Sequence, residues 1–132
     1  MKLLYIMLAA FLLLSCAKEK EQYSTNSIVG SWKLIETRND PGDGSGRFIA
    51  AQDEATITFT PSGEYNDTRN NLYNRYEMVT NDTVRLSHNL KPTVKLLAIQ
   101  ELTSGTLTYF HGWPWCGGPS GEKFSRQGKQ SY

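Results

Sequence analysis

Short segments of alternating apolar and polar residues fill the sequence from residue 28 to residue 127. They are rich in β-branched and aromatic residues, and turn sequences separate them. A period of two predicts strands with one buried face, and no segment shows the period of an amphipathic helix. The pattern predicts eight strands, at residues 29–37, 55–60, 64–68, 73–80, 83–87, 93–102, 106–110 and 122–127, and leaves a short extra strand open at 47–51.

The connections between these strands are alternately long and short. The short turns are residues 61–63, 81–82 and 103–105, and the long loops are residues 38–54, 69–72, 88–92 and 111–121. In a sequential antiparallel meander, alternate connections lie at opposite ends, whereas a Greek-key sandwich gives no reason for this alternation. We therefore expect an all-β fold, an eight-stranded antiparallel up-and-down β-barrel with one tight end and one open mouth.

The N-terminal residues follow a different pattern. Lys2 precedes an apolar run over residues 3–14, which is shorter than the ~20 residues that span a bilayer as a helix. A basic start, a short apolar run and a small residue at its end are typical of a secretory signal peptide. The residues LLSC at 13–16 resemble the bacterial lipobox. This resemblance implies that residues 1–15 are a lipoprotein signal peptide and that Cys16 is lipidated, with palmitate among its acyl chains.

Residues 16–27 are polar and without apolar periodicity, as in a flexible tether. Their charged run at 18–21 resembles the tags that direct lipoproteins of some Gram-negative bacteria to the outer face of the outer membrane, although a merely solvated linker fits this run equally well. We expect a lipid anchor in the outer membrane, on the periplasmic side or at the cell surface. The membrane is thus an expected partner through the N-terminal lipid.

Charge excludes one class of partner. The full chain has 14 Lys and Arg against 13 Asp and Glu, and removal of residues 1–15 takes away Lys2, which leaves 13 against 13. No basic stripe exists, so nucleic acid is not an expected partner. The remaining length suits one domain, with the barrel at 28–127 and a tail at 128–132. Cys116 has no disulfide partner if Cys16 carries lipid.

Two short motifs carry a family resemblance. The G-x-W motif of Gly30 and Trp32 matches the signature of lipocalins and of short bacterial lipocalin-like lipoproteins. The segments at 57–65, 75–87 and 96–110 look like the successive hairpins of that family, and the segment ending in Arg126 resembles its closing strand. The resemblance implies a structural barrel floor in which Arg126 packs over Trp32. Strand order also places these two residues together at the closed end.

The barrel interior follows from the alternation. The inward positions are Trp32, Leu34, Ile57, Phe59, Tyr65, Tyr76, Met78, Val84, Leu86, Leu96, Leu107, Tyr109 and Phe124. Leu96, Leu97 and Ile99 do not fit one face, so we expect a bulge in that strand. A solid interior and a ligand cavity both remain open, and the tyrosines favour a cavity because buried phenols need hydrogen-bond partners.

The mouth loop at 111–121, HGWPWCGGPSG, is the most unusual segment. Its tryptophans could stack on a ring or a sugar face, or pack inward as core. The candidate ligand-binding residues are Trp113, Trp115, His111, Tyr109, Tyr76, Tyr65 and Phe59. A metal site of His88, His111 and Cys116 lacks tight ligand spacing, so we expect no metal and no cofactor.

No motif of a hydrolase, a nucleotide-binding loop or a metalloprotease occurs, and the sequence does not predict an enzyme. The leading hypothesis is a lipid-anchored envelope lipoprotein that binds a small, partly apolar ligand at its open end. The alternative is a protein-binding module, for example an enzyme inhibitor, that uses the rim loops of a solid barrel. An envelope structural component, or an enzyme with an unrecognised site, is the third hypothesis.

Overall fold

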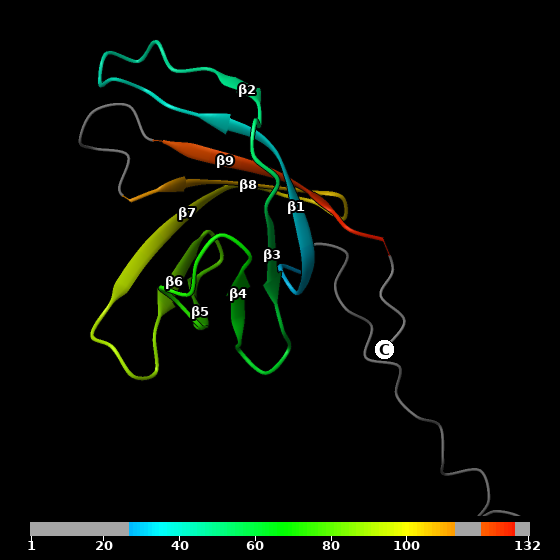
Figure 1. Cartoon of the computed structure of the whole chain (residues 1–132), viewed down its shortest axis with the longest axis vertical. Helices are drawn as coiled ribbons and strands as arrows, with labels where there is room; N and C mark the ends of the chain where they lie inside the picture. The colour runs from blue at the N-terminus through cyan, green and yellow to red at the C-terminus, as the bar shows by residue number, and fades with distance from the viewer. Residues whose placement is uncertain (1–26, 113–119, 129–132) are drawn as a thin grey trace, which may run out of the picture.

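The computed structural model describes residues 27–112 and 120–128, and these contain strands and no helix (Figure 1). No helix that could cross a membrane occurs within these two ranges. The strands are β1 (Gly30–Arg38), β2 (Phe48–Ala50), β3 (Thr56–Phe59), β4 (Tyr65–Asp67), β5 (Arg75–Thr80), β6 (Thr83–Ser87), β7 (Val94–Leu102), β8 (Thr106–His111) and β9 (Gly121–Arg126).

The strands form one antiparallel sheet that curves into a ring, in which, β2 apart, strands consecutive along the chain are neighbours. Its order is β4-β3-β1-β9-β8-β7-β6-β5, and the short β2 pairs only with β1. An isolated bridge between Glu64 and Arg75 joins the two ends of this order. Beside the bridge, the Tyr65 amide donates to Asn74 O at 3.0 Å and the Tyr76 amide donates to Gly63 O at 3.0 Å. The predicted eight-stranded up-and-down barrel is confirmed as nearly closed, and β2 is the extra strand left open above.

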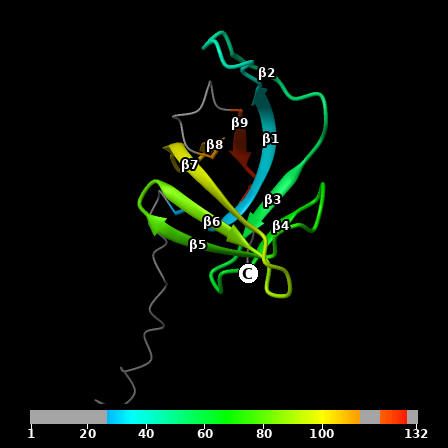
Figure 2. The ribbon, with the colours of Figure 1, turned by 90° about the vertical axis from the view of Figure 1, so that its left-hand side faces the viewer.

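The ring order also fixes the two ends of the barrel. Each strand runs opposite to its neighbours, so the connections alternate between the ends. The turns β3–β4, β5–β6 and β7–β8 lie at the end where β1 begins and β9 finishes, which we call the closed end. The longer connections lie at the other end, which we call the mouth. Figure 2 shows the strands curving round one interior.

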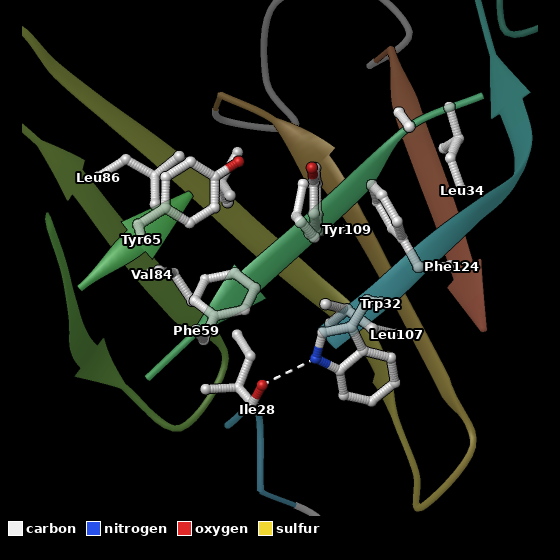
Figure 3. Packing of buried hydrophobic residues seen from close by; sticks show 13 residues of the cluster. Ile28, Trp32, Leu34, Phe59, Tyr65, Val84, Leu86, Leu107, Tyr109 and Phe124 are labelled. Carbon is white, nitrogen blue, oxygen red and sulfur yellow. Dashed lines mark hydrogen bonds between the residues drawn. The ribbon is translucent and has the colours of Figure 1, made fainter. Parts of the chain in front are cut away.

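Apolar side chains fill the interior towards the closed end (Figure 3). The largest fully buried residues are Trp32, Tyr109, Phe59, Phe124, Ile57, Leu97, Leu107 and Val84. Ring contacts connect neighbouring strands here, with the Phe59 and Tyr65 centroids 5.2 Å apart. This half of the barrel is therefore a packed core.

Two predicted interior positions were wrong. Leu97 is buried in place of Leu96, and Met78 is 39% exposed. Met78 lies in the part of β5 beyond its bridge to Glu64, where β6 is the only paired strand. Side chains there have no second neighbour to cover them. The expected bulge in β7 is present, between Ile99 and Glu101.

Candidate functional site

The closed end is held by a contact between the first and last strands of the ring. Trp32 and Arg126 are directly opposite each other in the β1–β9 register. The Arg126 guanidinium lies 4.1 Å from the centroid of the Trp32 ring. It also donates to three backbone carbonyls, those of Ser27, Val29 and Ser104, at 2.6–2.8 Å. These bonds connect the chain entry, the β7–β8 turn and β9, so the arginine has a structural role.

Gly30 is explained by the same contact. Its φ is +135°, a conformation that residues with a side chain rarely adopt. A Cβ at this position would lie 2.7 Å from Arg126 Nη1. The glycine of the G-x-W motif is therefore required both by its backbone angle and by the space that the guanidinium occupies.

The mouth half of the barrel contains a cavity of about 310 Å³, which we call the mouth cavity. Its volume is at the lower end of the range for small-molecule sites, roughly 300–1,000 Å³. Ionisable groups line one part of it, namely Asp67, Arg69, Lys95, His111 and Glu122, together with the phenols of Tyr65 and Tyr109. Apolar side chains also line the cavity, chiefly Leu72, Leu86 and Leu97.

Arg69 is the centre of the polar part. Its Nε donates to Asp67 Oδ1 at 2.9 Å and its Nη2 donates to Asp67 Oδ2 at 2.8 Å. Its Nη1 pairs with Glu122 on the other side of the cavity. Both carboxylates are nearly buried, with side-chain exposures of 8% and 9%. The hydrogen bonds to Asp67, followed by those to Glu122, raise the pKa of Arg69, which therefore stays charged.

Glu122 accepts hydrogen bonds from two side chains and lies beside a third, His111. The Tyr109 hydroxyl donates to its Oε2 at 2.6 Å, and His111 Nε2 lies 3.4 Å from the same oxygen. Burial alone would raise the pKa of Glu122, but hydrogen bonds from His111, Arg69 and Tyr109 outweigh burial and hold this pKa well below the ordinary value of 4.5. Glu122 is thus a fixed negative charge.

Both phenols remain protonated donors. Tyr65 donates to Asp67 Oδ2 at 3.4 Å, and Tyr109 donates to Glu122. Burial raises the pKa of each tyrosine, and the neighbouring carboxylates raise it further. Buried phenols need hydrogen-bond partners, and for Tyr65 and Tyr109 carboxylates of the barrel itself are these partners.

Lys95 has no such partner. It is half-buried on β7, and it forms no hydrogen bond and no ion pair within residues 27–112 and 120–128. Burial lowers its pKa, although the Glu122 charge opposes this shift. In the β6–β7 register Lys95 is directly opposite Leu86, and Leu97 follows two residues later on the same face. The register therefore places Lys95 beside Leu86 and Leu97 in the cavity lining, and its charge also interacts with those of Glu122, Arg69 and Asp67.

The sequence-predicted ligand residues are distributed between the two halves. Tyr65, Tyr109 and His111 line the mouth cavity together. Phe59 is fully buried in the core, and Tyr76 donates from its hydroxyl to Thr60 O at 2.6 Å, so neither of them lines the cavity. The predicted ligand residues Trp113 and Trp115, together with Cys116 and the predicted lipidation site Cys16, lie outside the described residues.

Asp67, Arg69, Lys95 and Glu122 were not among the residues predicted from the sequence. Alternation alone contained a signal for two of them, because Asp67 follows the inward Tyr65 by two residues and Glu122 precedes the inward Phe124 by two. Charged residues at inward strand positions indicate a polar interior site.

A second hollow, of about 300 Å³, lies where β3, β4 and β5 meet, and hydroxyl, amide and charged side chains line most of it. Its Asn74 and Asn89 already bond to each other, with Nδ2 of Asn74 2.6 Å from Oδ1 of Asn89. Two of the amides in this hollow are therefore engaged with each other.

Within the described ranges, no three His, Cys, Asp or Glu side chains form a group that could hold a metal ion. Comparison of the chain with protein-family models, curated proteins and solved structures found no match. The site geometry must therefore carry the functional argument by itself.

Proposed function

We propose that the protein is a lipid-anchored envelope lipoprotein whose barrel binds a small, partly apolar ligand in the mouth cavity. The observation that carries this proposal is the cavity lining, in which leucines lie beside a rigid network of charges and phenols. Binding sites of this kind combine an apolar wall with a few placed polar groups. The Arg69 network fixes the polar wall before any ligand arrives.

The anchor is inferred from the LLSC sequence at 13–16 and its resemblance to the lipobox. A tether that ends at Ser27 joins the barrel at its closed end, where the Ser27 carbonyl accepts a hydrogen bond from Arg126. In this arrangement the mouth opens away from the attachment point. A ligand can enter while the protein stays anchored.

A neutral fluorescent probe such as phenylnaphthylamine tests the proposal. Leu86→Phe adds volume inside the cavity, whereas Val79→Phe adds a similar ring at a position that is 49% exposed on β5. We expect the wild type and Val79→Phe to bind the probe equally, and Leu86→Phe to bind at least tenfold more weakly. Melting temperatures establish that both variants are folded. Equal binding by all three proteins would contradict the proposal.

A second function is favoured by a separate observation. Leu72, Leu90 and Val94 are 51%, 85% and 61% exposed, and they lie on or beside two rim loops that hydrogen bonds join. An apolar rim of this kind suits a protein-binding module, such as an enzyme inhibitor. Replacement of Leu90 by Asp would then abolish capture of a protein partner and leave probe binding unchanged.

A further inference from the structure

We propose that Lys95 selects a ligand with a single negative charge, an amphipathic molecule such as a small carboxylate whose apolar part lies against Leu72, Leu86 and Leu97. This inference rests on the proposed function, because it concerns the same cavity. It adds the chemical class of the ligand and the residue that recognises it.

Most of the charges that line the cavity are already paired. Asp67 and Glu122 both bind Arg69, and each also faces a phenol. A cationic ligand would find both carboxylates engaged. Lys95 is the one cation lining the cavity that has no ion pair with another described residue. The cation left without an ion-pair partner among the described residues of the cavity lining is therefore Lys95.

The position of Lys95 sets the shape of the ligand. Lys95 is directly opposite Leu86 in the strand register, and side chains in directly opposite positions have Cβ atoms about 4.5–5.5 Å apart. Leu97, two residues along the same face, is opposite His111. A molecule with an anionic head at the ammonium then has these leucines beside it for its apolar part. Such a molecule is amphipathic.

Desolvation of Lys95 explains why an anionic ligand is preferred to a neutral one. A half-buried ammonium without a partner is destabilised relative to one in water, and burial lowers its pKa accordingly. A neutral ligand that fills the cavity would remove more water from Lys95 and would supply no negative charge to compensate the ammonium. A monoanion would compensate the ammonium in a site where water is scarce. The cavity therefore favours an acid over the alcohol with the same chain.

The test compares octanoate with octanol by isothermal titration. We expect the wild type to bind octanoate at least tenfold more tightly than octanol. Lys95→Met keeps the length of the side chain and removes its charge, so this preference should disappear while octanol binding is kept or improved. Lys91→Met is the matched control, because Lys91 is an exposed rim lysine that does not line the cavity. It should retain the preference, and Lys95→Arg should restore most of it.

The outcomes separate this inference from the proposed function. If octanol binds the wild type as tightly as octanoate, or if Lys95→Met keeps the preference, the role of Lys95 is overturned and a ligand cavity remains. If neither amphiphile binds the wild type, the binding proposal fails together with this inference. Loss of the preference in Lys91→Met as well would assign it to the general charge of the rim and overturn the inference.

Discussion

Arg126 lies over the indole of Trp32, with its guanidinium carbon 4.1 Å from the ring centroid, and the two residues pair across β1 and β9. This pair joins β1 and β9, the first and last strands along the chain, which are neighbours in the sheet. Trp32 is fully buried, and its Nε1 donates to Ile28 O at 2.8 Å. The closed end therefore combines a buried indole, a hydrogen bond and a cation–π contact.

The first prediction concerns this pair. Trp32→Ala removes a fully buried indole and should lower the free energy of unfolding by ~3–5 kcal/mol. Arg126→Ala should cost less, because its guanidinium lies at the barrel surface. The double mutant should lose less free energy of unfolding than the sum of the two single losses, since cation–π contacts of this kind contribute ~0.5–2 kcal/mol. Chemical denaturation of the four proteins measures the coupling, and strict additivity would show that the contact contributes nothing.

The second prediction concerns the glycine beside this pair. Gly30→Ala places a Cβ against Arg126 Nη1 at a positive φ, so it should destabilise the barrel by about 1–3 kcal/mol. Gly105→Ala is the matched control at the same end, because a Cβ there meets nothing within 4 Å. The two melting temperatures check the prediction. Similar values for both variants would mean that Gly30 is not under this constraint.

The third prediction concerns the polar network of the mouth cavity. Arg69→Met leaves two nearly buried carboxylates without their cation, and breaking buried ion pairs in this way costs ~3–5 kcal/mol. Arg85→Met removes an exposed pair with Glu77, so it should cost no more than ~1 kcal/mol. Urea denaturation at neutral pH compares the two variants. Equal losses would contradict a buried network.

The same network predicts a pH dependence. The folded-state pKa of Glu122 is below its ordinary value of 4.5, so the stability from its ionised form is present above pH 4.5 and is lost as the pH falls. Without Arg69 this pKa is less depressed, and less stability depends on ionisation. The difference in the free energy of unfolding between the wild type and Arg69→Met should therefore become smaller as the pH falls below 4.5. A difference that does not change with pH would mean that Arg69 stabilises the fold by contacts other than its ion pairs with carboxylates.

The fourth prediction concerns the membrane anchor. Cys16→Ser removes the thiol that would accept lipid, so palmitate labelling should be lost and unprocessed precursor should accumulate. Cys116→Ser is the control, because it removes the other cysteine and leaves the lipobox intact. Metabolic labelling followed by electrophoresis measures both effects. Normal labelling of Cys16→Ser would exclude the lipoprotein hypothesis.

The fold was predictable because its signal is repeated along the chain. Most strands alternate. The long and short connections together determine which residues share an end, so the pairing of Trp32 with Arg126 follows from strand order. Leu96 was wrongly assigned because β7 contains adjacent leucines and a bulge, so that alternation alone gives no unique register. Met78 was misplaced because β5 loses its second neighbour beyond the bridge at Arg75.

The candidate site was less predictable for a different reason. Arg69 lies in a loop, where alternation does not predict whether a side chain points inward. Its partners Asp67 and Glu122 belong to β4 and β9, which are far apart in sequence. The charge of each residue alone suggests solvent exposure. Only the closed ring shows that the three side chains share one interior, where they pair. Tyr65 and Tyr109 were found because inward phenols are recognisable from single strands.

The most direct test of the binding proposal is a native mass spectrum of the processed protein purified from its own host. The proposal predicts a small-molecule mass that remains bound under gentle ionisation, is released on denaturation and is absent from Leu86→Phe. Val79→Phe should retain it. Protein that carries no small molecule, or the same added mass in Leu86→Phe as in the wild type, would contradict a ligand site in the mouth cavity.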